Sequence, residues 1–279
     1  LDLKLGRVDS LDIPEDPLMK RAAGLGDAHE RRVLADYRRQ FGAGVVEVRR
    51  PGGSDPAALA AAMQQTLDAM DGGTDVVFQA VVFDGDFHGF ADFLVRTPDG
   101  EYEVRDAKLA RHAKVPALLQ IAAYADVLRA NGAPMARNGA LILGDLRQES
   151  FDLDPVIPVY RDRRRTLTAM VQAHVAGGST ASWDVPGIVI CGRCPLCEQE
   201  AAARDDLLLV AGMRMTQRAK LHDAGVMTVA QLAERGQAVP QMSARTLNTL
   251  REQARLQRGG PGDGSLAYDV YNPSALAAI

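Results

Sequence analysis

Residues 76–108 read VVFQAVVFDGDFHGFADFLVRTPDGEYEVRDAK, and this stretch decides the fold. Apolar residues cluster on both sides of Asp84-Gly85-Asp86 and Pro98-Asp99-Gly100, which are typical hairpin-turn sequences. The pattern predicts three antiparallel strands, at residues 76–83, 87–95 and 102–109. We therefore expect a β-sheet at the centre of the protein.

Helices are predicted on both sides of these strands. Helical spacing of apolar residues predicts helices at residues 16–41, 55–70, 115–129 and 160–175. Short apolar runs predict further strands at residues 45–48 and 140–143. The second helix has an N-cap candidate in Ser54 or Asp55. This order of elements predicts an α/β core with a mixed β-sheet flanked by helices.

The composition is that of an ordinary globular protein and excludes several classes. The 279 residues are 47% hydrophobic and carry a net charge of -4, which argues against a protein that coats nucleic acid through bulk charge. The sequence has neither an apolar stretch long enough to cross a bilayer nor a secretion signal, so no membrane partner and a cytoplasmic location are expected. It begins with Leu1 rather than Met, and we expect it to be part of a longer protein.

Two carboxylates and a lysine are predicted to meet on neighbouring strands. Asp106 and Lys108 are two residues apart and so point to the same face, and Asp92 on the preceding strand can lie opposite them. Paired carboxylates bind Mg²⁺ or Mn²⁺, which lowers the pKa of a bound water for phosphodiester hydrolysis. An isolated D-x-K is usually solvated surface charge, but Asp92 stands in an apolar run, where an unpaired carboxylate is costly.

These residues resemble the motifs of the RecB-like branch of the PD-(D/E)xK nucleases. The resemblance rests on Asp92, on Asp106-Ala107-Lys108 and on Gln120-x-x-x-Tyr124, and Gly26-Asp27-Ala28-His29-Glu30 resembles the upstream metal-binding helix. It implies a restriction-endonuclease-like core. The implied metal ligands are His29, Asp92, Asp106 and the carbonyl of Ala107; the implied catalytic residues are Asp92, Asp106, Lys108, Gln120 and Tyr124. Without the resemblance, His29 would be a helix-surface histidine.

The resemblance also implies a function and a larger protein. It implies a metal-dependent DNA nuclease, an exonuclease on single strands or DNA ends, in DNA repair, recombination or defence. In similar proteins this unit is followed by an RNase H-like region and a superfamily 1 helicase. The alternatives are an inactive nuclease fold that only binds DNA and a zinc-stapled interaction domain.

All three cysteines of the chain lie together at Cys191, Cys194 and Cys197. An odd, clustered set without a secretion signal favours a metal site over disulfides, although free thiols remain an alternative. Three thiolates are one short of the four that zinc or a [4Fe-4S] cluster takes. Resemblance to iron-sulfur RecB-like nucleases implies a [4Fe-4S] cluster with its fourth cysteine upstream of Leu1, while the compact spacing keeps Zn²⁺ open.

The segment after the cysteines is predicted to be a separate small all-α domain. Residues 204–258 hold 9 Lys and Arg against 5 Asp and Glu, a net charge of +4, in short helices broken by glycines. They resemble helix-hairpin-helix modules, with candidate DNA contacts at Arg214, Arg218, Lys220 and Gly225. A purely structural helical bundle is the alternative. The predicted boundaries are 1–200 for the nuclease domain, 201–258 for this domain and 259–279 for a linker.

Overall fold

The computed structural model describes residues 1–9, 16–180, 183, 190–192 and 194–259. The chain divides into two compact units: Pro14–Gly178, and Leu1–Ile13 together with Ser179–Ile279. The linker predicted at 259–279 lies outside the described residues except for Gly259, and the predicted domain boundaries stay a prediction. No helix of the described residues is both long and apolar enough to cross a bilayer.

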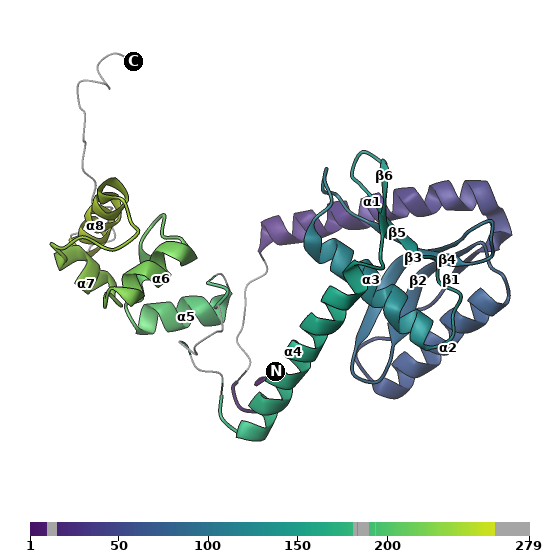
Figure 1. The fold of residues 1–279 in the computed structure, drawn as a ribbon, viewed down its shortest axis with the longest axis horizontal. Coiled ribbons are helices and arrows are strands. Elements are labelled where there is room, and N and C mark those ends of the chain that lie inside the picture. Colours follow the sequence, from purple (N-terminus) through teal and green to yellow (C-terminus); the bar gives the residue numbers. More distant parts are fainter. Residues whose placement is uncertain (10–15, 181–182, 184–189, 193, 260–279) are drawn as a thin grey trace, which may run out of the picture. The chain divides into compact units, whose positions relative to one another are not determined.

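The unit Pro14–Gly178 is built on one six-stranded sheet (Figure 1). Its strands are β1 (Val45–Glu47), β2 (Val76–Phe83), β3 (His88–Arg96), β4 (Tyr102–Ala107), β5 (Asn138–Ile142) and β6 (Gln148–Asp152). They lie in sequence order; β1 with β2 and β4 with β5 are parallel, and the other neighbours are antiparallel. The predicted mixed sheet and α/β class are confirmed. The short edge strand β6 was not predicted, because its polar sequence carries no strong apolar signal.

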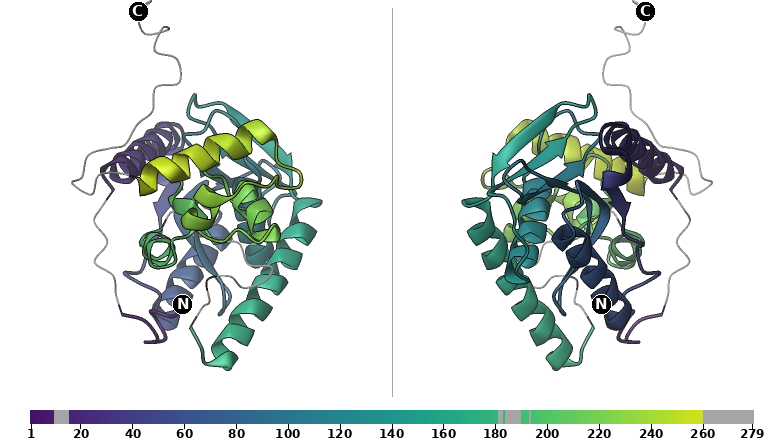
Figure 2. Two further views of the ribbon diagram at one scale, coloured as in Figure 1. Left: turned by 90° about the vertical axis from the view of Figure 1, so that its left-hand side faces the viewer. Right: turned by 90° about the vertical axis from the view of Figure 1, so that its right-hand side faces the viewer.

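Three helices flank the sheet, α1 (Pro17–Phe41), α2 (Pro56–Asp71) and α3 (Val115–Ala130), and α4 (Val156–Gly177) packs against α3. The side views in Figure 2 show the twisted strands among these helices. Helix α1 packs on one face, against a cluster that includes Phe78 and Phe93. Helices α2 and α3 pack on the other face, against a cluster that includes Val77, Leu94 and Val104.

The side-chain alternation of the central hairpin shifts at one residue pair. Gln79, in the middle of β2, has φ 57°, the left-handed conformation that costs a non-glycine residue energy. The pairs Phe78 with Phe93 and Ala80 with Ala91 place Gln79 opposite Asp92. In a regular strand Ala80 would lie on the same face as Phe78. Instead, Ala80 packs in the cluster on the α2 and α3 face, whereas Phe78 packs in the cluster on the α1 face. The left-handed residue therefore lies opposite Asp92, the first of the predicted catalytic residues.

The described part of the second unit is helical and has its own core. Its helices are α5 (Pro195–Ala203), α6 (Met215–Asp223), α7 (Val229–Glu234) and α8 (Ala244–Arg258). Leu207, Leu221 and Leu232 are fully buried in its core. Thr228 and Gln231 form the predicted capping box at the start of α7. The small all-α part of the predicted fold is thus present.

Arg218, one of the predicted DNA contacts, is buried in this core. Its Nε and Nη2 donate to Asp206 Oδ1 and Oδ2 at 2.9 and 2.6 Å, and Trp183 Nε1 donates to Asp206 Oδ2 at 3.1 Å. The ion pair lowers the pKa of Asp206 although burial alone would raise it. The Arg218 guanidinium therefore stabilises the unit from inside, whereas Arg214 and Gly225 are exposed.

Arg218→Ala is expected to destabilise this unit. It leaves the Asp206 carboxylate buried without its cation, which typically costs about 3–5 kcal/mol. Hydrogen exchange of the full chain should show faster exchange in α6, α7 and α8. Lys220→Ala is the control, because its Nζ makes only a surface hydrogen bond to the carbonyl of Gln241. Equal protection in the two variants would contradict a structural role for Arg218.

Candidate active site

Strands β3 and β4 bring Asp92, Asp106 and Lys108 together. Phe93 pairs with Arg105, so one residue further along the ladder Asp92 lies opposite Asp106. Asp92 Oδ2 accepts a hydrogen bond from the backbone N–H of Ala107 at 2.8 Å, which orients the carboxylate across the two strands. Asp106 is only 1% exposed. The convergence predicted from strand parity is present in the structure.

Burial and mutual repulsion change the protonation of the two carboxyl groups. Burial, with the charge of Asp106 as the second cause, raises the pKa of Asp92 to about 7. Burial also raises the pKa of Asp106, although Lys108 opposes this effect. The pair therefore resists carrying two negative charges unless a cation is near.

Lys108 is the cation that the chain itself provides. Its Nζ lies 2.5 Å from Asp106 Oδ2. Burial alone would lower the pKa of Lys108, but the charge of Asp106 more than offsets this and the pKa is raised. The side chain is therefore an ammonium that can stabilise negative charge and orient a water, and it is not a free base.

Gln120 and Tyr124 on α3 hold the ammonium in place. Lys108 Nζ donates to Gln120 Oε1 at 3.2 Å, and Gln120 Nε2 donates to the Tyr124 hydroxyl at 2.9 Å. The Tyr124 ring fills the space above Gly89 on β3, where an added Cβ would lie 2.3 Å from the ring. Glycine at this position thus permits the close approach of α3 to the site.

His29 reaches the site from α1. Its Nε2 lies 3.1 Å from the carbonyl oxygen of Ile142, which also accepts the backbone N–H of Lys108 at 2.8 Å. A metal-binding histidine commonly donates its second ring N–H to a carbonyl in this way, and Nδ1 would then be the ligand atom. Within the described residues, however, His29, Asp92 and Asp106 do not form a close cluster of three potential ligand atoms.

The carboxylate pair fits a divalent cation. Both carboxylate oxygens of Asp106 are buried, and while Oδ2 contacts the Lys108 ammonium, Oδ1 has no hydrogen-bond partner among the described residues. Oxygen ligands of this kind are the ones that Mg²⁺ prefers. The residues placed to hold the ion are Asp92 and Asp106, with His29 and the carbonyl of Ala107 as the further predicted ligands.

A second group, Glu30 with Gln79, lies beside the carboxylates and was not among the predicted site residues. Burial raises the pKa of Glu30, the charge of Arg50 opposes this, and the charges of Asp92 and Asp106 couple to Glu30. Gln79 donates a hydrogen bond to Glu30. The available signal was a single glutamine in the apolar run of β2.

Arg50 lies over the ring of Phe90, 4.8 Å from its centroid, which makes a cation–π contact at the rim of the site. Arg50 is exposed and Phe90 is partly buried. Cationic and aromatic groups in this combination can contact phosphates and stack on bases. Neither residue belongs to the motifs that pointed to the site.

The three cysteines form a separate candidate centre in the other unit. The sulfur atoms of Cys191, Cys194 and Cys197 all lie within 4.8 Å of one another. Burial, and then the contact with Cys191, raises the pKa of the Cys197 thiol. The arrangement places three soft ligands around one point, so it can bind a metal.

The sheet topology and the acidic pair with its lysine define a nuclease-type α/β fold. The family model described as the PD-(D/E)XK nuclease superfamily matches residues 12–199. The chain belongs to this superfamily. A solved structure from Eubacterium rectale, described as a "Putative exonuclease", is similar with a TM-score of 0.38 and 11% identity over 71% of this chain and 78% of that chain. No curated protein matches the chain.

The raised pKa of Asp92 predicts that the metal-free protein loses stability as pH rises. The folded state keeps a proton, with a pKa of about 7, that the unfolded state releases near the ordinary value of 3.8. Between these values unfolding releases a proton, so stability falls with increasing pH, by about 1.4 kcal/mol for each unit of pKa difference. Asp92→Asn should flatten this dependence.

Thermal melting in EDTA at pH 5 and pH 8 tests this expectation. A change of 1 kcal/mol shifts the Tm of a domain of this size by about 2–4 °C. Asp162→Asn, which changes a largely exposed carboxylate, is the control and should keep the parent's pH dependence. Added Mg²⁺ should raise the Tm of the parent at pH 8, because it binds only the folded state. An unchanged slope in Asp92→Asn would contradict the assignment.

Proposed function

We propose that this protein is a metal-dependent DNA nuclease that hydrolyses phosphodiester bonds, acting as an exonuclease on single strands or DNA ends. The observation that carries the proposal is the carboxylate pair of partly buried Asp92 and buried Asp106, with Lys108 beside it. A fold that only bound DNA would gain nothing from a carboxylate pair that raises its own pKa and destabilises the metal-free protein. The superfamily membership supports hydrolysis as the reaction class.

The residues have distinct roles in the proposed reaction. A Mg²⁺ or Mn²⁺ ion held by Asp92, Asp106, His29 and the Ala107 carbonyl would supply Lewis-acid chemistry and a more acidic water. Lys108 would orient the attacking water and stabilise the negative charge that develops on the phosphate. Gln120 and Tyr124 would hold Lys108 at that position. Arg50 on Phe90 would contact the strand at the rim.

Asp106→Asn and Lys108→Ala are each expected to lower the cleavage rate by at least about a hundredfold. DNA affinity measured in EDTA, which prevents metal-dependent hydrolysis, should stay within a few-fold of the parent. The matched controls are Asp162→Asn and Arg39→Ala, which remove exposed charges on α4 and α1. Cleavage at the parent's rate in both active-site variants would overturn the assignment of this site, and a parent that binds DNA without cleaving it would support the rival, a DNA-binding module without activity.

The wider assignment rests on the resemblance of the motifs to RecB-like nucleases. We propose a role in DNA repair, recombination or defence, and a full-length protein that also carries RNase H-like and helicase regions. For residues 201–258 we propose sequence-independent contact with DNA phosphates through Arg214, Lys220 and Gly225, with Arg218 supporting the unit from inside. Contacts of this kind release counterions, so they weaken as salt increases.

For the cysteines we propose a [4Fe-4S] cluster, with Zn²⁺ as the alternative. The full-length protein purified without oxygen should be brown, with broad visible absorption and about four iron atoms per chain. Cys194→Ser should lose both the colour and the iron. About one equivalent of zinc in a colourless protein would overturn the cluster and support a zinc staple. A protein that contains neither iron nor zinc, and whose three thiols are freely alkylated, would contradict both the cluster and the zinc site.

A further inference from the structure

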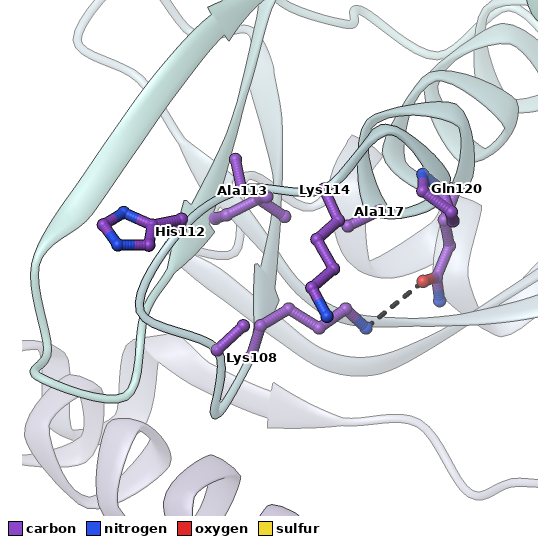
Figure 3. A pocket seen from close by; sticks show the side chains of 9 residues that line it. Lys108, His112, Ala113, Lys114, Ala117 and Gln120 are labelled. Carbon is purple, nitrogen blue, oxygen red and sulfur yellow. Dashed lines mark hydrogen bonds between the residues drawn. The ribbon is translucent and has the colours of Figure 1, made fainter. Parts of the chain in front are cut away.

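A pocket of about 240 Å³ opens beside the proposed catalytic lysine (Figure 3). It shares Lys108 and Gln120 with the candidate active site and extends from them along the start of α3. The other side of the pocket is apolar, with Ala113, Ala117 and Leu141 in its lining. A molecule in this pocket would therefore touch the same ammonium that faces the scissile phosphate.

The charged groups that line the pocket are two lysines, Lys108 and Lys114. Lys114 and His112 lie in the loop between β4 and α3, and no carboxylate lines the pocket. Lys108 is already paired with Asp106, but Lys114 takes part in none of the ion pairs or side-chain hydrogen bonds found in the described part of the chain. Figure 3 shows the Lys114 side chain extending toward the same part of the pocket as Lys108. The pocket thus offers an unneutralised positive charge.

Charge, apolar wall and size together indicate the class of ligand. An unpaired cation favours an anion, and an apolar wall favours a flat ring or a sugar face. Pockets for drug-sized ligands occupy about 300–1,000 Å³, so this smaller one suits a single nucleotide unit and not a base pair. A nucleoside monophosphate combines the required anion and ring.

We propose that this pocket binds the terminal nucleotide of the strand being cut, with its phosphate at Lys114 and its base against Ala113 and Ala117. This inference rests on the proposed nuclease function and deepens it. It names a subsite that recognises a strand end, next to the lysine that faces the bond to be broken. Recognition of a terminal nucleotide makes cleavage dependent on an end.

The direct test is binding of a mononucleotide to the metal-free full chain. Deoxyadenosine 5′-monophosphate, its 3′-isomer and inorganic phosphate are titrated in EDTA and followed by calorimetry or ligand-observed NMR. We expect saturable binding of at least one nucleotide, tighter than that of phosphate alone. The isomer that binds more tightly identifies the end that the pocket accepts.

Two variants test the positive charge and the apolar wall of the pocket separately. Lys114→Gln, at an exposed position, should weaken nucleotide binding about tenfold. Ala113→Leu should fill the pocket and weaken nucleotide binding more than it weakens phosphate binding. Arg111→Gln is the matched control, because it removes a positive charge from the same loop without lining the pocket. No saturable binding, or equal affinities in Lys114→Gln and Arg111→Gln, would overturn the proposal.

Asp106→Asn separates this inference from the proposed function. That variant should bind the mononucleotide like the parent and fail to cleave DNA. If it cleaves normally while Lys114→Gln still loses nucleotide binding, the subsite stands and the catalytic assignment falls. If it is inactive but the parent binds no nucleotide, the catalytic assignment stands and the subsite falls.

Discussion

The structure of the sheet-bearing unit depends on keeping two carboxylates side by side, Asp106 buried and Asp92 partly buried. Each carboxylate in such a position needs a cation or a donated hydrogen bond, because burial alone disfavours its charge. The chain provides the Ala107 N–H for one and the Lys108 ammonium for the other. These partners offset only part of the cost, as the raised pKa values of both groups show. A site that is destabilised without a metal is well suited to binding one.

The surrounding elements are shaped to hold this arrangement. The left-handed backbone of Gln79 lies opposite Asp92 and shifts the alternation of the hairpin there. On the other side, the absence of a side chain at Gly89 lets Tyr124 approach β3 and complete the contacts to Lys108. A left-handed backbone at a non-glycine residue such as Gln79 persists where the surrounding packing requires it, and it is frequent at functional sites.

Much of the fold could be read from local patterns. The helices and the central strands appear near their predicted positions because apolar periodicity and turn sequences act over a few residues. Strand β6 and the left-handed backbone at Gln79 were not foreseen, since neither has a local signal that separates it from ordinary polar sequence. Arg218 is a second case in which local sequence is not enough. A basic helix predicts surface charge, but Asp206, twelve residues away, holds this arginine in the core.

The sequence by itself determined the α/β class, the mixed sheet and the convergence of Asp92, Asp106 and Lys108. These follow from side-chain parity and hairpin connection, which are properties of neighbouring residues. Only the tertiary structure decided which groups from distant segments join them: Glu30 from α1, Arg50 after β1, and the pocket at the start of α3. Such contacts depend on how helices pack across a sheet, and no spacing within the sequence encodes that packing.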